Sequence, residues 1–248
     1  MLTEERYSAI LRELEVRGAV TVQELCEHLE ISESTVRRDL INLDKQGKLI
    51  KVRGGATRAG RRFLPEEPDV STKQQLHTAE KDRIARYAAA QIDDSDFVYI
   101  DAGTTTERMI DYIESSRATF VTNGIVHARK LIQKGCKAYI VGGQIKLSTQ
   151  AVVGTLASGM LRQYNFTKAF LGVNGISVSR GFTTPDPEEA ELKAEACRQA
   201  FVSFILADSS KFGMVSAVTF LDLDKACILT DRIPDEKYRK AATIKELL

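Results

Sequence analysis

The residues best suited to a chemical role have hydroxyl, amide or basic side chains and lie between positions 34 and 53. Five lie on one expected helix, away from its apolar stripe, and two more alternate with apolar residues just after it. Arginine offers a fork for guanine or phosphate, and serine, threonine and asparagine offer adaptable hydrogen bonds. This is the chemistry of DNA recognition, and the candidate residues are Ser34, Thr35, Arg37, Arg38, Asn42, Lys51 and Arg53.

Three short helices are expected to position these side chains. The first begins at Thr3, the second opens with a capping box over Thr21–Glu24, and the third is capped by Ser32 and ends at Gly47. Val36, Leu40 and Leu43 form the apolar stripe of the third helix. The short connection between the second and third helices is typical of a helix-turn-helix, and the alternating segment 48–55 predicts a small β-wing.

The distribution of charge supports a DNA-facing surface more than the total does. The formal net charge is only +1, but residues 35–62 carry nine basic and two acidic residues, against three and eight in residues 1–34. A basic helix face is often just a solvated surface, and that alternative stays open for Arg37 and Arg38 taken alone. Because capping, helix spacing, wing and charge all agree, the sequence favours DNA binding by this module.

A second candidate site follows from the pattern of the remaining chain, where short apolar runs alternate with helical stretches. This alternation predicts a mostly parallel sheet covered by helices. The expected strands are Phe97–Ile100, Thr119–Val121, Ala138–Val141, Ala169–Val173, Phe201–Ala207 and Cys227–Leu229. The expected helices between them are Thr105–Ile113, Ile125–Gln133 and Pro187–Gln199.

The loop Asp101–Thr106, which follows the first strand and opens a helix, has the composition of an anion site. Gly103 lets the backbone approach a ligand, and the exposed amides and dipole of the helix favour negative charge. Thr122-Asn123 and Gly142-Gly143 end the next two strands, so one shared pocket is expected, with ordinary glycine turns as the alternative. The chain has neither a Gly-Lys-Ser/Thr phosphate loop nor a G-x-G-x-x-G motif, which leaves nucleotide binding unsupported.

Composition sets the domain limits and excludes several classes of protein. Arg58 to Val70 holds Gly60, Pro65 and Pro68 and reads as a connector, after which residues 72–92 turn helical. We predict domains over 1–57 and 72–248, joined by a linker over 58–71.

No apolar run is long enough for a membrane helix, and the acidic N-terminus is unlike a signal peptide. Four scattered cysteines and three histidines argue against a zinc site or a disulfide framework, so we expect a cytoplasmic protein without metal or cofactor.

Two groups of motifs connect the chain to a known family. In the first domain they are Ser32 to Leu40, read as SESTVRRDL, and Arg53-Gly54-Gly55-Ala56; in the second they are Asp101–Thr106, Thr122-Asn123, Gly142-Gly143, Asn174-Gly175 and Ala207–Lys211. With these motifs the chain resembles the DeoR family of bacterial regulators. The resemblance implies a winged helix-turn-helix followed by an α/β sensor domain similar in fold to ribose-5-phosphate isomerase and glucosamine-6-phosphate deaminase.

The same resemblance implies which residues bind a sugar-phosphate effector. Gly103 to Thr106 would hold the phosphate, and Lys211 would reach a sugar oxygen or the phosphate, although a lone lysine after a turn is commonly just exposed. The full implied set is Asp101, Gly103, Thr104, Thr105, Thr106, Thr122, Asn123, Gly142, Gly143, Asn174, Gly175 and Lys211.

Catalysis is not expected at this site. The similar isomerases carry an Asp-Gly-Ala-Asp segment where this chain has Asn174-Gly175-Ile176-Ser177, and an amide and a hydroxyl cannot act as the carboxylate base of enediol chemistry. Glu188, Glu189 and Glu191 could supply a carboxylate, but acids at a helix start also suit the helix dipole. We therefore expect a sensor that does not turn over its ligand, with an isomerase carrying a DNA module as the alternative.

Within the family, the segments 141–146, 181–190 and 207–213 resemble fructose-operon repressors. This implies a repressor that leaves its operator DNA when it binds fructose 1-phosphate. We also expect a homo-oligomer built from dimers, whose winged helices read repeated or inverted half-sites. Regulators that sense tagatose or galactitol phosphates share most of these motifs, and an activator would have the same domains, so both alternatives remain.

Overall fold

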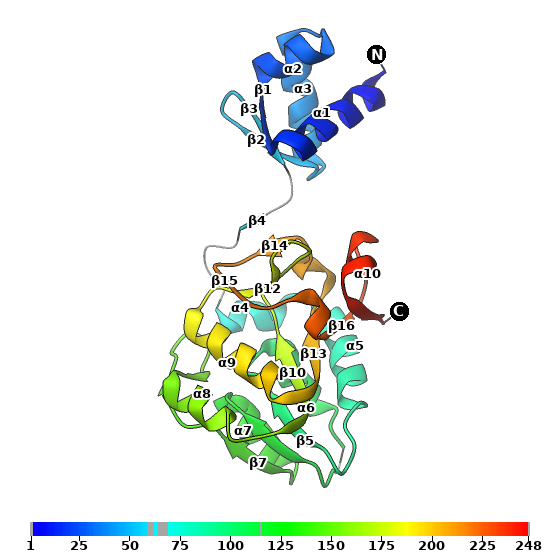
Figure 1. Ribbon diagram of the computed structural model, residues 1–248. Helices are drawn as coiled ribbons and strands as arrows, with labels where there is room; N and C mark the ends of the chain where they lie inside the picture. The colour runs from blue at the N-terminus through cyan, green and yellow to red at the C-terminus, as the bar shows by residue number, and fades with distance from the viewer. Residues whose placement is uncertain (1, 59–61, 64–68, 115, 248) are drawn as a thin grey trace. The chain divides into compact units, whose positions relative to one another are not determined.

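The computed structural model describes residues 2–58, 62–63, 69–114 and 116–247 (Figure 1). The chain divides into two compact units, Met1–Arg62 and Phe63–Leu248. This division falls inside the predicted linker 58–71, and the predicted linker residues Gly60, Arg61, Pro65 and Pro68 lie outside the described residues.

The first unit combines three helices with a three-stranded antiparallel sheet. The helices are α1 (Thr3–Arg17), α2 (Val22–Leu29) and α3 (Glu33–Lys45), and the strands β1 (Ala19–Thr21), β2 (Leu49–Val52) and β3 (Gly55–Arg58) lie in the order β1-β3-β2. The predicted wing is therefore the β2–β3 hairpin, while β1 is a strand that the sequence pattern did not indicate. The Thr21 capping box is confirmed, since the Glu24 N–H donates to Thr21 Oγ1 at 3.1 Å and the Thr21 N–H to Glu24 Oε2 at 2.7 Å.

The first unit has its own hydrophobic core. Helix α3 contributes the three apolar residues expected of it, Val36, Leu40 and Leu43, all fully buried. Around them pack Ile10, Leu14, Val20, Val22, Leu25, Leu49 and Ala56 from the other helices and all three strands.

The second unit is built on a seven-stranded sheet in which every neighbouring pair is parallel. The strands are β5 (Phe97–Ile100), β6 (Thr119–Thr122), β7 (Lys137–Ile140), β10 (Phe166–Gly172), β13 (Ala200–Leu206), β16 (Cys227–Thr230) and β17 (Thr243–Glu246). They lie in the order β17-β16-β13-β10-β5-β6-β7. All six predicted strands are present, and the edge strand β17 is an addition.

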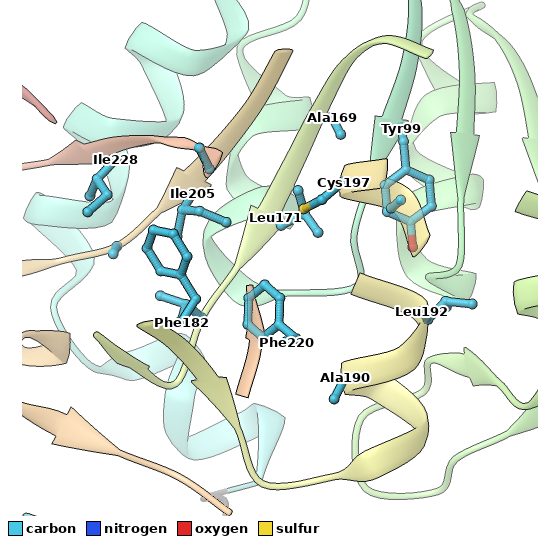
Figure 2. Close-up of a cluster of buried hydrophobic side chains, with 14 of the residues drawn as sticks. Tyr99, Ala169, Leu171, Phe182, Ala190, Leu192, Cys197, Ile205, Phe220 and Ile228 are labelled. Atoms are coloured by element: carbon cyan, nitrogen blue, oxygen red, sulfur yellow. The ribbon is translucent and has the colours of Figure 1, made fainter. Parts of the chain in front are cut away.

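Helices cover both faces of this sheet because side chains alternate along each buried strand. In β5, Val98 and Ile100 pack with α5 (Thr78–Ala89), α6 (Thr104–Asp111) and α7 (Ile125–Gln133). Tyr99 points to the opposite face and belongs to a core that also includes residues of α8 (Thr155–Leu161), α9 (Pro187–Arg198) and α10 (Lys237–Ala241). Figure 2 shows this second core, with Leu192 of α9 near strand residues such as Tyr99 and Leu171.

Shorter elements complete the two units, namely β4 (Arg62–Phe63), α4 (Val70–Gln75), β8 (Gln144–Ile145), β9 (Val152–Val153), β11 (Gly175–Ser177), β12 (Gly181–Thr184), β14 (Met214–Val215), β15 (Val218–Leu221) and the 3-10 helices Ser209–Lys211 and Leu223–Lys225. The helical pattern expected over 72–92 is present as two helices. It is divided into α4 and α5 at His77, whose φ of 51° breaks the helix. Within the described residues, no helix is both long enough and apolar enough to cross a membrane.

The strand order creates a switch point between β5 and β10. From β5 the chain continues through α6 to β6 on one side, and from β10 it continues to β13 on the other. Connections that leave two adjacent strands in opposite directions open a crevice at the carboxyl ends of those strands, where open α/β sheets bind ligands.

Candidate functional site

The outer face of α3 carries three of the seven predicted DNA-contacting residues. Ser34, Arg37 and Arg38 are exposed and continue toward Ile41 and Lys45 at helical spacing. The Arg37 side chain is 63% exposed, and its Nε donates to Glu33 Oε1 at 3.0 Å, so its charge is held on the helix surface. This stripe presents guanidinium, ammonium and hydroxyl groups over three turns of one helix.

The start of α3 differs in detail from the prediction. Ser32 occupies the N-cap position, but its hydroxyl does not cap a backbone amide. Instead it lies 2.9 Å from Thr35 Oγ1 and 3.1 Å from Ser34 Oγ. Thr35 is consequently half-buried in a local hydroxyl cluster, and Ser34 is the more accessible of the two.

Asn42 does not belong to the exposed stripe. It is half-buried, and its Nδ2 donates to the Tyr7 hydroxyl at 3.1 Å, which ties α3 to α1. A second tie nearby joins Arg6 to the buried Asp39 through two hydrogen bonds of 2.8 and 3.2 Å. The sequence signal for this pair was the position of Asp39 on the apolar stripe, since a carboxylate there needs a cationic partner.

The wing presents the two remaining predicted residues to solvent. Arg53 lies at the tip of the β2–β3 hairpin, beside Gly54 with a φ of 86°, and Lys51 is exposed on β2. The Lys51 N–H donates to Asp44 Oδ1 at 3.1 Å, which fixes the wing against the end of α3.

A cleft of about 270 Å³ opens in the second unit at the switch point between β5 and β10. It is bordered by the ends of these strands, the first turns of α6 and α7, a loop before β9, α9, and the α4–α5 segment. The lining residues are Val70, Ser71, Lys73, Gln74, Lys81, Asp101, Ala102, Gly103, Thr104, Thr105, Glu107, Gly124, Val126, His127, Thr149, Gln150, Gly172, Val173, Asn174, Glu189, Lys193, Leu206, Asp208 and Lys211.

Six predicted effector residues line this cleft, namely Asp101, Gly103, Thr104, Thr105, Asn174 and Lys211. Thr104 and Thr105 are the first residues of α6, so their N–H groups have no acceptor within the helix. The Gly103 N–H is already used, because it donates to Thr106 Oγ1 at 2.9 Å and to the Asp101 carbonyl at 2.9 Å. The groups of this loop that could bind an anion are therefore the N–H groups of Thr104 and Thr105 and the hydroxyls of the same two residues.

Three further predicted residues do not line the cleft but hold its loops. The Thr106 hydroxyl is buried and donates to the Asp101 carbonyl at 2.5 Å. Asn123 Oδ1 accepts from the Ala102 N–H at 2.9 Å and its Nδ2 donates to the Val152 carbonyl at 3.2 Å. Thr122 Oγ1 accepts from the Gly124 N–H at 3.1 Å.

The remaining three predicted residues, Gly142, Gly143 and Gly175, also lie outside the lining. A Cβ on Gly143 would lie 2.5 Å from the Val153 carbonyl oxygen, and one on Gly175 would lie 2.5 Å from that of Met214. For these two glycines, close backbone packing is the reason for the residue type. The expectation that the third strand end forms part of the pocket is wrong.

The cleft also collects four lysines, of which the sequence had indicated only Lys211. Lys81 is 4% exposed, and its Nζ donates to the Lys73 carbonyl. Burial lowers the pKa of Lys81 to about 8, and the like charge of Lys211 acts in the same direction. The spacing of Lys81 to Ile84, Ala85 and Ala88 on α5 was the available signal, because it places the lysine on the buried stripe.

Another of the four lysines, Lys193 of α9, forms an ion pair with Asp101, one of the predicted effector residues. Its Nζ donates to Asp101 Oδ2 and, at 3.1 Å, to the Gly172 carbonyl. Asp101 Oδ2 also accepts from the Gly172 N–H at 3.1 Å. The Asp101 carboxylate is thus held at the cleft wall by a buried ion pair.

His127 packs against the loop Asp101–Thr106, the predicted phosphate-binding loop. It is buried, and its Nε2 lies 3.1 Å from the Gly103 carbonyl oxygen, to which the Nε2–H tautomer donates. Burial lowers the pKa of His127, which favours the neutral ring. A Cβ on Gly124 would lie 2.4 Å from His127 Nδ1, so a glycine is required beside this ring.

Of the three glutamates considered for catalysis, only Glu189 lines the cleft. Its Oε1 accepts from Lys146 Nζ at 3.0 Å and from Thr149 Oγ1 at 3.0 Å. Lys146 also pairs with Asp186 at 2.9 Å. Among the described residues, no cluster of three histidine, cysteine or acidic side chains could hold a metal ion.

Comparison with known proteins identifies the family. The DeoR-like helix-turn-helix domain model matches residues 6–62, and the DeoR C terminal sensor domain model matches residues 76–232. The chain is 40% identical to the transcriptional regulator FruR of Bacillus subtilis over 99% of this chain and 98% of FruR. It is 32% identical to a lactose phosphotransferase system repressor of Staphylococcus epidermidis over 98% of both chains.

Among solved structures, ribose 5-phosphate isomerase A of Methanocaldococcus jannaschii matches 53% of each chain, with a TM-score of 0.40 and 14% identity. The predicted fold class is confirmed, with an N-terminal helix-turn-helix domain and a parallel α/β domain. The similar full-length chains are named as regulators and repressors, and the prediction of a regulator instead of an enzyme is confirmed with them. This chain belongs to the DeoR family of helix-turn-helix transcriptional regulators.

Proposed function

We propose that this chain represses a sugar-utilisation operon in the cytoplasm and leaves its operator when it binds a phosphorylated sugar. The effector we propose is fructose 1-phosphate, and the regulated genes are those for fructose use. The resemblance of segments 141–146, 181–190 and 207–213 to fructose-operon repressors supports fructose over other sugars. Another ketose or hexitol phosphate is the alternative, since the lactose phosphotransferase system repressor is 32% identical over 98% of this chain.

One observation carries the effector class, namely that the first amides of α6 and the lysines of the α4–α5 and Ser209–Lys211 segments line the same cleft. Helix amides and ammonium groups both favour a phosphate, and no metal is needed for this recognition. Within the described residues, Lys211 Nζ has no ion-pair partner, so its charge is available to a ligand. The volume of about 270 Å³ suits a small ligand, because sites for larger molecules reach roughly 1,000 Å³.

The exposed stripe of α3 and the wing support operator binding. A recognition helix reads the major groove while basic wing residues neutralise phosphates. One such module reads one half-site, so we propose a homo-oligomer built from dimers. Effector binding would favour an arrangement in which two recognition helices no longer match the half-site spacing.

The test uses the full-length protein and a panel of fructose 1-phosphate, fructose 6-phosphate, glucose 6-phosphate, tagatose 6-phosphate, galactitol 1-phosphate and free fructose. We expect fructose 1-phosphate to raise the unfolding midpoint, because a ligand that binds only the folded state stabilises it. Operator duplexes selected from a random pool should then be released by the same compound.

A midpoint raised by tagatose or galactitol phosphate alone would replace fructose with the alternative effector. A panel without any effect would contradict sugar-phosphate sensing. Tighter operator binding in the presence of the effector would contradict release, and conversion of one sugar phosphate into another would favour the isomerase.

A further inference from the structure

A tight turn over residues 146–151 brings two polar residues, Thr149 and Gln150, to the wall of the cleft. The turn connects the antiparallel strands β8 and β9. Two backbone hydrogen bonds of 2.8 Å close it, from the Lys146 N–H to the Ala151 carbonyl and from the Gln150 N–H to the Lys146 carbonyl.

Gln150 has a backbone conformation that is unusual for its residue type. Its φ is +53°, in the left-handed region that disfavours any residue with a branched or long side chain. Among the described residues, the other non-glycine residues with positive φ are Glu30 and His77, which lie at helix ends. A helix end explains those two conformations, whereas Gln150 is the one that lines the cleft.

The surrounding contacts hold this turn on the first turns of two helices. On the α9 side, Thr149 Oγ1 donates to Glu189 Oε1 at 3.0 Å, and Lys146 pairs with Glu189 and Asp186. On the α7 side, the Ile125 N–H donates to the Gln150 carbonyl at 3.4 Å. The Thr149 hydroxyl is therefore already engaged, and the position of the Gln150 backbone is fixed.

The side-chain amide of Gln150 is the group left for a ligand. Gln150 is exposed, and its side-chain amide makes no hydrogen bond to the described residues of the chain. A carboxamide donates through its nitrogen and accepts through its oxygen, which matches a hydroxyl group that also does both. Lysines and helix amides only donate, so they recognise a phosphate whatever sugar carries it.

We propose that Gln150 reads the hydroxyl groups of the sugar part of the effector and so determines which sugar phosphate the cleft prefers. This inference rests on the proposed function, which supplies the class of ligand. In this proposal, the helix amides and ammonium groups of the cleft bind the phosphate, and the 146–151 turn binds the sugar.

The test measures affinities by titration calorimetry on the full-length protein. The ligands are fructose 1-phosphate, tagatose 6-phosphate and glucose 6-phosphate. Inorganic phosphate is the probe that lacks the sugar. Gln150→Ala should lower the affinity for the preferred sugar phosphate by about 5- to 10-fold, because one or two neutral hydrogen bonds are lost. The affinity for inorganic phosphate should change by less than about twofold. Ser148→Ala is the matched control, since Ser148 is exposed on the same turn but does not line the cleft.

Gln150→Gly separates the amide from the backbone, because glycine adopts a positive φ without strain. We expect it to lose as much sugar-phosphate affinity as Gln150→Ala while the free protein unfolds at a higher temperature than that variant. Full affinity in Gln150→Gly, or equal losses for inorganic phosphate and sugar phosphate, would overturn the role of the amide.

The two proposals fail in different ways. Unchanged sugar selectivity in Gln150→Ala overturns this inference while the wild-type protein still binds sugar phosphate. A wild-type protein that binds none of the four phosphates overturns the proposed function and, with it, this inference.

Discussion

Lys193 and Asp101, 92 residues apart in the sequence, form a buried ion pair across the switch point of the sheet. Both side chains are less than a tenth exposed. Because Lys193 also donates to the Gly172 carbonyl, one ammonium group joins the ends of β5 and β10 to α9. The wall of the cleft therefore depends on a pair of charges that must be present together.

Removing one member of this pair should be costly. We expect Lys193→Met to lower the free energy of unfolding by about 3–5 kcal/mol, since it leaves the Asp101 carboxylate buried without its cation. The double variant Lys193→Met/Asp101→Asn should recover part of this loss, and urea denaturation measures both. The control is Arg117→Ala, which removes an ion pair with Asp94 from a side chain that is 88% exposed and should cost less than about 1 kcal/mol.

Operator binding should depend on the exposed stripe of α3. Arg38→Ala should weaken binding to a selected operator by about 10- to 100-fold through the loss of a base or phosphate contact worth about 1–3 kcal/mol. Effector affinity should not change. Arg12→Ala is the control, because Arg12 is an exposed arginine of the same unit that lies on α1. Equal operator affinities of the two variants at fixed salt would argue against α3 as the reading helix.

The two neighbouring threonines of the phosphate loop should behave differently. Thr105→Val removes a hydroxyl that lines the cleft, so it should weaken sugar-phosphate binding about tenfold at unchanged stability. Thr106→Val removes a buried hydroxyl bonded to the loop backbone, so it should lower the free energy of unfolding by about 1–3 kcal/mol. Calorimetry and urea denaturation together distinguish the two, and identical profiles would contradict this division.

Effector affinity should fall as the pH rises through about 8. The pKa of Lys81 is lowered to about 8 by burial, so its ammonium loses its charge between pH 7 and 9 while the effector stays dianionic. We expect the affinity at pH 9 to be about tenfold lower than at pH 7, and Lys81→Met to remove this dependence. The free protein should show the opposite trend and gain stability from about pH 8 to 10.5, because the unfolded chain keeps the proton longer.

Calorimetry at pH 7, 8 and 9 in buffers of equal ionic strength checks this behaviour. His127 does not interfere, because burial lowers its pKa below the ordinary value of 6.5, outside this range. A wild-type affinity that is constant from pH 7 to 9 would remove Lys81 from the list of effector contacts.

The sheet could be predicted because buried parallel strands are short continuous apolar runs. Phe97–Ile100 and Cys227–Thr230 are of this kind, and both were found at nearly the right positions. Strands β11 and β12 were missed, since Gly175–Ser177 and Gly181–Thr184 have the glycine, serine and threonine composition of loops. Their pairing depends on residues that only the folded chain brings together.

The candidate sites show the same limit. The exposed stripe of α3 follows from its helical period, whereas Asn42 was misplaced because its partner Tyr7 belongs to another helix. Loop composition indicated Thr104 and Thr105, but the lysines that line the same cleft come from distant segments. The Lys193–Asp101 pair has no signature in local sequence, because its two members meet only across the sheet.

The cleft draws its lining from residues between Val70 and Lys211, while the core of the first unit uses only residues from Ile10 to Ala56. Synthesis runs from the N-terminus, and domains fold as units once their residues have left the ribosome. The winged helix-turn-helix can therefore be complete when more than half of the cleft-forming chain is still untranslated. The helix-turn-helix unit of this regulator can therefore fold before its sensor domain is complete.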